Sequence, residues 1–437
     1  MRLNEVLPVA VLLSAAALHV APAHAQIERD VEPRFGLRVG VNHSDNPARA
    51  SEAESPESLT FASVGLDVGL EREAPRLLVY LDGNLDYYDY GSDDLENETL
   101  GNIEGGLQIR MVPELLVWDW DREIGNVRRD PFRSDGPGNR ERLSITTTGP
   151  TLTLPLTERD SLRIALGRSD RVWDQSDRLD SASDSGTIGW IRELSARQQI
   201  GLTATSEQVE YVIDAIPKYE IGAAYLTFRQ TFVSGGISFS IGRNRVAVEN
   251  QESDAGLYVD IVWNRRLAAY SSISFTGGRR FEDSANQFRV RIADVGPGEE
   301  VYDLPPSAGP FVRTRAGLTY SLNRPRLGFA FGMDLGEEQY EAQVARDRKR
   351  ARLSGSAYYR FADNTNIGVQ LFEMREEFRI DSRTRAERGA AVGLSHRLSA
   401  AWNMEVQYLR RRRHDLAGQG GFEENRISLR FAWVPGR

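Results

Sequence analysis

Apolar side chains occupy every second position in many short stretches of this chain. In Ile427–Trp433, bulky apolar residues alternate with polar or small ones, and the same alternation occurs in Phe35–Val41 and in Leu327–Met333. Successive side chains of a β-strand point to opposite faces, so this pattern predicts strands with one apolar and one polar face. We therefore expect a chain that consists almost wholly of such strands.

Short and long connections alternate between these stretches. Glu73–Pro75 and Asn323–Pro325 are short, whereas segments 168–186 and 282–310 are long and rich in charged residues, Gly, Ser and Asp. Outer-membrane barrels show this asymmetry, because short periplasmic turns alternate with long extracellular loops. The fold class we predict is all-β: a transmembrane antiparallel up-and-down β-barrel of about 20 strands, within a range of roughly 16 to 20 because a few strands are weakly patterned.

The first residues have the features of a cleavable secretory signal peptide, predicted at 1–25. A basic residue, Arg2, precedes the apolar stretch Val6–Val20, and Ala23–Ala25 forms an A-x-A cleavage site. Residues 26–33 are then predicted to be a short periplasmic N-terminal segment, and residues 34–434 the barrel. Export by this route predicts localisation in the outer membrane of a Gram-negative cell.

Composition agrees with an exported barrel. The chain has no cysteine, which suits passage through an oxidising compartment. Its net charge of −9 argues against nucleic acid as a partner. The mean hydropathy of −0.44 argues against a bundle of membrane helices, which need roughly 20 consecutive apolar residues each.

Charged side chains fall on the polar positions of many predicted strands. An arginine that faces hydrocarbon at mid-membrane costs about 2–4 kcal/mol, so these charges must face water or one another. Two interpretations remain: a polar conduit that selects solutes by charge, or a lattice of Arg–carboxylate pairs that braces the wall. The later strands lean basic, which suits an anionic solute. The predicted lumen-lining residues are Arg38, Asp67, Asp82, Asp86, Arg110, Arg313, Arg315, Asp334, Arg352, Arg360, Arg397 and Arg430.

Other clusters have two interpretations each. Tyr87, Tyr88 and Tyr90 are expected in an interfacial aromatic girdle together with several tryptophans, with stacking on a sugar as the alternative. The aspartates of segment 168–186 are predicted to form a solvated acidic loop, since their spacing matches no calcium-loop pattern. The run Arg410–Arg413 either clamps outer-leaflet phosphates or an acidic polymer, or is plain loop charge.

Catalytic motifs are missing from the sequence. No serine lies in a G-x-S-x-G elbow, no H-E-x-x-H occurs, and no Gly-rich phosphate loop follows a strand. His43 and His396 fall on positions predicted to face lipid, which disfavours a catalytic role. We predict no enzyme activity, no catalytic residues, no metal site and no cofactor.

Two short motifs carry a family resemblance. The first predicted strand, Gly36–Asn46, and the last hairpin element, Glu424–Leu429, resemble the opening and closing strands of outer-membrane barrels encoded with exopolysaccharide-biosynthesis and PEP-CTERM export systems. Such barrels usually end on an aromatic residue, whereas here Pro435–Arg437 follow Trp433 and Val434. The resemblance implies a barrel that acts beside surface-polysaccharide production, and it transfers no binding residues.

Three functions follow from these observations. The leading hypothesis is a porin-like barrel with a charged, water-filled lumen that passes exopolysaccharide or a polar solute. The alternative is a non-transporting surface barrel whose long loops bind polymer or a partner, and a soluble β-solenoid or sandwich is the third. The expected partners are outer-membrane lipid and lipopolysaccharide, the outer-membrane insertion machinery and a polysaccharide. The sequence does not specify the substrate or the oligomeric state.

Overall fold

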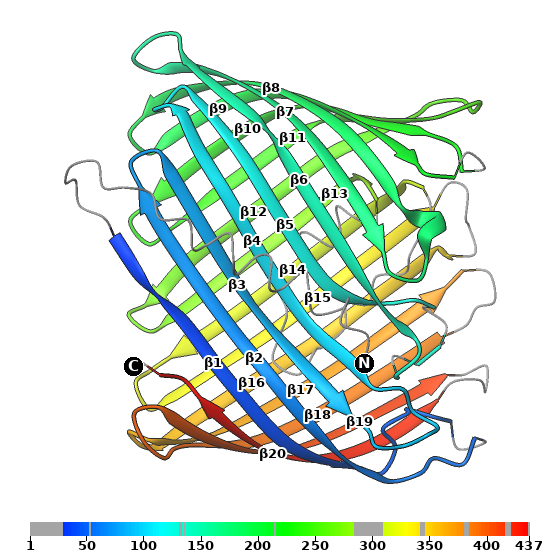
Figure 1. Ribbon diagram of the computed structural model, residues 1–437. Coiled ribbons are helices and arrows are strands. Elements are labelled where there is room, and N and C mark those ends of the chain that lie inside the picture. Colours follow the sequence, from blue (N-terminus) through cyan, green and yellow to red (C-terminus); the bar gives the residue numbers. More distant parts are fainter. Residues whose placement is uncertain are drawn as a thin grey trace.

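The chain forms a closed barrel. The computed structural model describes residues 29–51, 54–130, 133–134, 136–213, 216–283, 309–340, 346–379, 384–415 and 421–435. Within these residues, a single antiparallel sheet of 20 strands closes on itself (Figure 1). The predicted fold class and strand number are therefore confirmed. None of the helices among the described residues has the length and apolar character needed to cross a membrane.

Every strand pairs with its neighbours in chain order, in an up-and-down arrangement. The strands are β1 (Arg29–Ser44), β2 (Leu59–Ala74), β3 (Leu77–Asp89), β4 (Glu98–Val112), β5 (Leu116–Arg128), β6 (Arg140–Pro155), β7 (Asp160–Trp173), β8 (Ser181–Ser195), β9 (Gln198–Tyr211), β10 (Tyr219–Phe232), β11 (Gly235–Val248), β12 (Asp254–Ala268), β13 (Ser271–Glu282), β14 (Phe311–Asn323), β15 (Leu327–Tyr340), β16 (Arg348–Ala362), β17 (Thr365–Phe378), β18 (Thr384–Arg397), β19 (Trp402–Asp415) and β20 (Phe422–Trp433). A single 3-10 turn, η3 (Asp177–Leu179), lies between β7 and β8.

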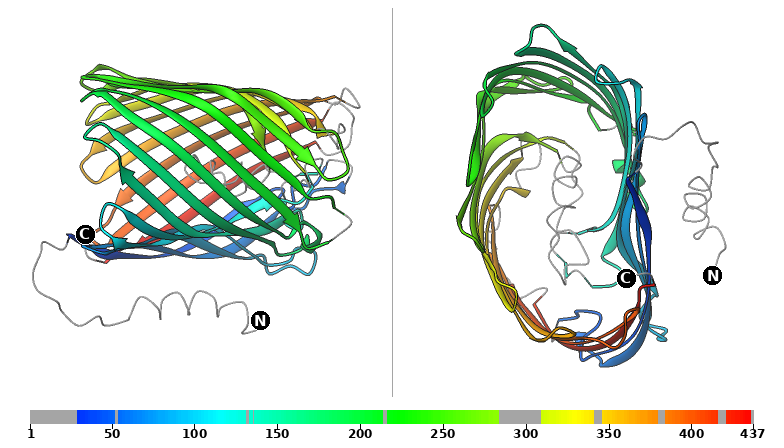
Figure 2. Two further views of the ribbon diagram at one scale, coloured as in Figure 1. Left: turned by 90° about the horizontal axis from the view of Figure 1, so that it is seen from above. Right: turned by 90° about the vertical axis from the view of Figure 1, so that its left-hand side faces the viewer.

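The barrel closes where β1 meets β20. Their register runs from Leu37 opposite Trp433 to Ser44 opposite Arg426, so the sheet has no free edge between these strands. Seen along its axis, the wall is an oval ring (Figure 2). We call the rim that carries the short connections, such as the one from Ala74 to Leu77, the turn end. The opposite rim, with the long connections, is the loop end.

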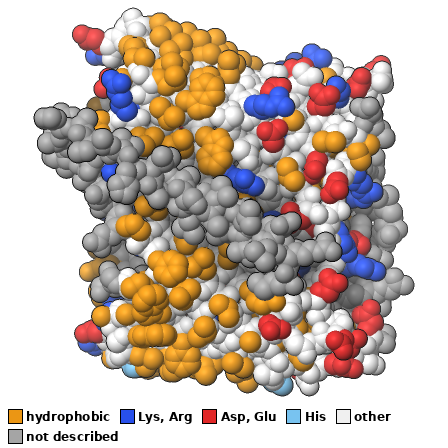
Figure 3. Space-filling view, viewed as in Figure 1, with side chains coloured by type: hydrophobic (Ala, Val, Ile, Leu, Met, Phe, Trp, Pro, Cys, Tyr) orange, Lys and Arg blue, Asp and Glu red, His pale blue; other side chains and the backbone are white. Residues whose placement is uncertain are grey.

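The outer face is apolar over much of its height. Phe329, Phe331 and Met333 on β15 point outward and are 37–47% exposed, while Gly328 and Gly332 on the alternate positions are buried. Apolar side chains gather toward the turn end and charged ones toward the loop end (Figure 3). Such a large apolar surface is not stable in water. It identifies the chain as a membrane-spanning barrel, with hydrocarbon against the outer face.

A girdle of aromatic residues surrounds the barrel at the turn end of this apolar band. Six tryptophans occupy outward positions near that rim, and Trp402 lies opposite Trp433 where β19 pairs with β20. Their amphipathic rings suit the membrane interface. The members of this girdle are Trp118, Trp120, Trp190, Trp263, Trp402 and Trp433.

The strands extend further than the sequence pattern indicated. Predicted loop 168–186 contains the end of β7 and the start of β8, and the run Arg410–Arg413 belongs to β19 and not to a loop. The weakly patterned segments include β8 and β13, and β1 already begins at Arg29. Beyond the hydrocarbon a strand needs hydrogen-bond partners but no apolar face, so the alternation fades before the strand ends. Residues 1–28 and 284–308 lie outside the described residues.

Candidate functional site: the charged lumen

The predicted lumen-lining residues occupy the face opposite the apolar band. Arg38 on β1 bridges two strands, because its guanidinium binds Asp67 on β2 and lies 2.9 Å from Asp86 Oδ2 on β3. Near the turn end, the Arg34 guanidinium lies 3.3 Å from Asp82 Oδ2. These contacts link side chains of β1, β2 and β3 on one side of the sheet.

Further inward charges of the predicted set also have partners. Arg313 lies 3.1 Å from Glu282 and Arg315 lies 3.8 Å from Asp260. The Arg110 guanidinium lies 2.6 Å from Glu73.

The remaining members of the set have other surroundings. Asp334 lies opposite Arg352 in the register, and the Arg352 guanidinium lies 5.7 Å from the ring centroid of Phe372. Arg430 lies opposite Glu405 on the neighbouring strand. At the turn end, Arg397 donates to a main-chain carbonyl, and Arg360 pairs opposite Asn366. The interpretation as an ion-pair lattice therefore applies to much of this face, and charge selection stays a prediction.

A second set of inward charges, absent from the predicted set, lies toward the loop end and is deeply buried. Arg348 on β16 lies 2.7 Å from Glu338 on β15 and 3.3 Å from Glu376 on β17. The other carboxylate oxygen of Glu376 pairs with Arg385 on β18. The side chains of Glu376, Arg348 and Arg385 are at most 2% exposed. We call this set, with the pairs described next, the loop-end belt.

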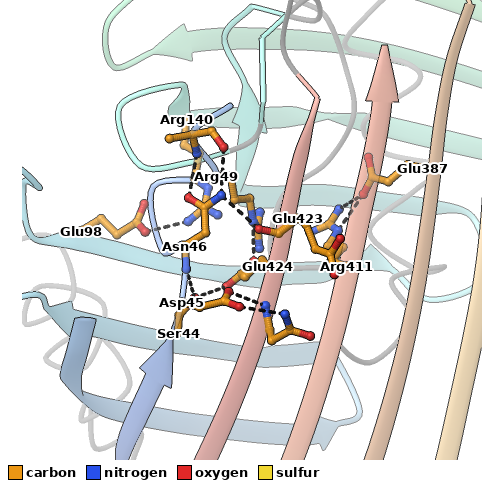
Figure 4. A network of polar contacts seen from close by, with 12 residues as sticks. Ser44, Asp45, Asn46, Arg49, Glu98, Arg140, Glu387, Arg411, Glu423 and Glu424 are labelled. Carbon is orange, nitrogen blue, oxygen red and sulfur yellow. Dashed lines mark hydrogen bonds and ion pairs between the residues drawn. The ribbon is translucent and has the colours of Figure 1, made fainter. Parts of the chain in front are cut away.

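The belt continues through β18, β19, β20 and β1. The Arg411 guanidinium lies 2.6 Å from Glu387 Oε1. Glu424 accepts from Ser44 at 3.1 Å and pairs with Arg49 at 2.9 Å, with side chains only 2–4% exposed for the pair. Figure 4 shows the Arg49–Glu424 group beside the Arg411–Glu387 pair. Buried charges of this kind need excellent geometry, because their desolvation is costly.

One contact of the belt crosses the mouth of the barrel. Arg413 on β19 donates to the carbonyl oxygen of Arg133, between β5 and β6, at 2.6 Å. Strands β20, β1, β2, β3 and β4 separate these two residues around the wall. A Cβ at Gly136 would lie 2.1 Å from the carbonyl oxygen of Ala48, so the β5–β6 and β1–β2 connections touch. These contacts narrow the loop end of the lumen.

A third group joins β7, β9, β10 and β13. Arg171 lies 2.7 Å from Glu207 and 3.2 Å from Asp283, and Tyr219 donates to Asp283 at 3.0 Å. The Tyr211 hydroxyl accepts from the N–H of Gly309 at 3.1 Å, just before β14. These contacts connect the residues that follow β13 and precede β14 to strands β7, β9 and β10.

The aromatic cluster differs from the prediction. Tyr88 and Tyr90 are 3% and 5% exposed, and they pack with Phe61 and Leu100 on the lumen side of the loop end. The girdle assignment is therefore wrong for these two tyrosines, because Tyr88 points inward on β3 and Tyr90, just after the strand, packs against Phe61. Their burial also removes the ring faces that sugar stacking requires. Only Tyr87, 39% exposed, points outward.

The acidic segment between β7 and β8 is divided by the structure. Asp170 and Asp184 lie on strands and point outward, where Arg168 is 3.3 Å from Asp184 and 3.8 Å from Asp170. The pKa of Asp180 is raised, because the effect of burial exceeds that of the hydrogen bond that its carboxylate accepts from the N–H of Trp173 at 2.7 Å. Among the described residues, no group of three or more His, Cys, Asp or Glu side chains is arranged to hold a metal ion.

The two histidines expected on the outer face do lie there. The Nδ1 atom of His43 is 2.9 Å from the hydroxyl of Thr60, and that of His396 is 2.8 Å from the hydroxyl of Thr365. In each case the partner is the residue directly opposite on the neighbouring strand.

Comparisons with known proteins give only distant matches. No protein-family model matches the chain, and no curated protein matches it. The FrpB iron transporter from Neisseria meningitidis (F5-1 variant) superposes with a TM-score of 0.46 at 8% identity, covering 93% of this chain and 83% of that chain. The siderophore receptor PirA from Pseudomonas aeruginosa gives 0.44 at 10% identity, covering 94% and 81%.

The ferric yersiniabactin uptake receptor FyuA from Yersinia pestis is a further match, with a TM-score of 0.42 at 12% identity, covering 93% of this chain and 80% of that chain. These scores are too low to support an argument about function. The barrel assignment rests on this chain's own strand pairing and outer surface.

Proposed function

We propose that this chain is an outer-membrane conduit for polar solutes. The observation that carries the proposal is the contrast between the two faces of the wall, apolar outside and charged inside along the same strands. Twenty tilted strands enclose a lumen of about 40 Å backbone diameter, which wall side chains alone do not fill. The proposal includes export by the predicted signal peptide and insertion by the outer-membrane machinery.

Anionic solutes suit the lumen best. Arg313, Arg315, Arg352 and Arg430 lie on inward positions of the later strands, and basic residues outnumber acidic ones there. The sequence resemblance favours an exopolysaccharide as the solute, and the basic inward positions favour an acidic one. The loop-end belt is then the selective barrier, because a solute must pass the Arg413 contact to cross the mouth.

Conductance of the purified full-length chain in planar lipid bilayers tests this proposal. We expect anion-preferring channels whose mean conductance rises in Arg413→Gln, because the cross-mouth contact is lost. Arg412→Gln is the matched control, since Arg412 is adjacent but points to the outer face. Cation preference, or equal conductance of the two variants, contradicts the proposal.

A second candidate is a surface barrel that transports nothing. The deep burial of the belt and the contact across the mouth favour it. In that case both the wild type and Arg413→Gln stay non-conducting although they fold. Deletion of a long loop then abolishes binding of an acidic polymer.

A further inference from the structure

The arginine run of β19 serves two faces of the wall. Arg411 and Arg413 point into the lumen, whereas Arg410 and Arg412 point outward. Arg412 lies opposite Arg388 of β18, and Arg410 lies opposite Ala390. Three outward guanidiniums therefore lie together on adjacent strands.

Two alanines lie beside this group, among larger neighbours that include Arg375 of β17 and Asn425 of β20. The outward neighbours of Arg388 along β18 are Ala386 and Ala390. An alanine leaves open space at the level of the neighbouring guanidiniums. The surface therefore offers room for a ligand group between Arg388, Arg410 and Arg412.

The carboxylates nearby do not saturate these arginines. Arg388 lies 2.9 Å from Glu373, and Arg410 and Arg412 share Glu423 at 2.7 and 3.8 Å. Each of the three arginine side chains is more than half exposed. A guanidinium has five N–H donors, so each retains donors for an additional anion. With three cations and two carboxylates, the group attracts negative charge.

The position of the three arginines along the barrel axis indicates which layer of the membrane surrounds them. On the turn-end side, the outward positions of β18 and β19 are apolar, with Val392 41%, Val406 38% and Tyr408 42% exposed. On β17, Glu373 is the first charged residue at an outward position, two residues after Leu371. The arginines therefore lie at the loop-end border of the hydrocarbon, where lipid headgroups are expected.

We propose that Arg388, Arg410 and Arg412 form a binding site for the phosphate of an outer-leaflet phosphorylated glycolipid. Planar guanidiniums bind phosphate oxygens in pairs, which gives both strength and orientation. The acyl chains of the lipid extend along Val392, Val406 and Tyr408 toward the turn end. The site requires the loop end to face the outer leaflet, but it does not depend on solute passage.

The test measures binding of bisphosphorylated lipid A to the full-length barrel in phosphatidylcholine nanodiscs. The double variant Arg410→Gln/Arg412→Gln is expected to bind at least about tenfold more weakly, because charge-assisted hydrogen bonds are lost. The matched control is Arg243→Gln/Arg245→Gln. These two arginines share the spacing and outward exposure on β11, but Leu257 and Ala255 lie opposite them and no third arginine does.

A third variant separates lipid binding from wall stability. Glu423→Gln removes the carboxylate that competes for Arg410 and Arg412, so lipid A binding should tighten. If the pairs of Glu423 with Arg410 and Arg412 serve only to stabilise the wall, both Glu423→Gln and the arginine variant should bind lipid A more weakly. Heat-dependent gel mobility checks that each variant is folded.

Several outcomes overturn the proposal. They are unchanged binding in the arginine variant, an equal loss in the β11 control, and equal binding of dephosphorylated lipid A. Full competition by inorganic phosphate at equal concentration would assign the site to free anions. Competition by an acidic polysaccharide, but not by lipid, would assign it to that polymer.

Discussion

Glu376 on β17 offers the sharpest test of the buried belt. Its side chain is fully buried, with one carboxylate oxygen 3.3 Å from Arg348 and the other paired with Arg385. The substitution Glu376→Gln keeps the shape but removes the charge. Two buried guanidiniums then face a neutral amide, and one of them faces its NH₂ group.

The expected loss is large. Removing one partner of a buried ion pair costs about 3–5 kcal/mol, because the remaining charge is left uncompensated. The matched control is Glu373→Gln on the same strand. Glu373 points outward and is 50% exposed beside Arg388, so solvent screens it. Exposed pairs contribute about 0–1 kcal/mol.

Urea unfolding of the barrel in phospholipid vesicles, followed by tryptophan fluorescence, measures both values. We expect the free energy of unfolding to fall by about 3–5 kcal/mol for Glu376→Gln and by less than about 1 kcal/mol for Glu373→Gln. Equal losses for the two variants would refute the reasoning that burial decides the strength of these pairs.

Two further predictions concern local structure. At Gly101, with φ of 155°, a Cβ would lie 2.0 Å from the carbonyl oxygen of Asn84, so Gly101→Ala should lower the stability by at least about 1–3 kcal/mol. Gly355→Ala is the control, since nothing lies within 4 Å of its Cβ position, and equal thermal shifts of gel mobility would contradict this prediction. Tyr219→Phe removes the 3.0 Å hydrogen bond to Asp283, and urea unfolding should report a loss of about 1–3 kcal/mol; an unchanged midpoint would show that this buried bond contributes nothing.

The sequence was sufficient to predict the fold where hydrocarbon imposes a pattern. Positions such as Phe329 and Leu371 alternate with small or polar residues because lipid contacts one face of the strand. Near the loop end both faces are polar, so the alternation does not show that the run Arg410–Arg413 lies on a strand. If the two-residue alternation is continued through these charges, it places Arg411 and Arg413 inside the barrel and Arg410 and Arg412 on its outer face.

The local sequence pattern does not predict the contacts that cross the lumen. Arg413 meets Arg133 and Arg171 meets Asp283 because of the way the oval ring and its connections bring distant strands together. That geometry depends on strand number, register and tilt of the whole barrel. No short stretch of sequence encodes it.

Each membrane-spanning strand separates hydrocarbon on one face from water on the other. The chain has no cysteine, so single labels at Leu353 and Ser354, neighbours on β16 with opposite orientation, are unambiguous. We would attach a fluorophore to Leu353→Cys and to Ser354→Cys and compare quenching by nitroxide lipids with quenching by aqueous iodide. We expect lipid quenching at 353 and iodide quenching at 354; iodide quenching of equal strength at both positions would contradict this separation of lipid and water.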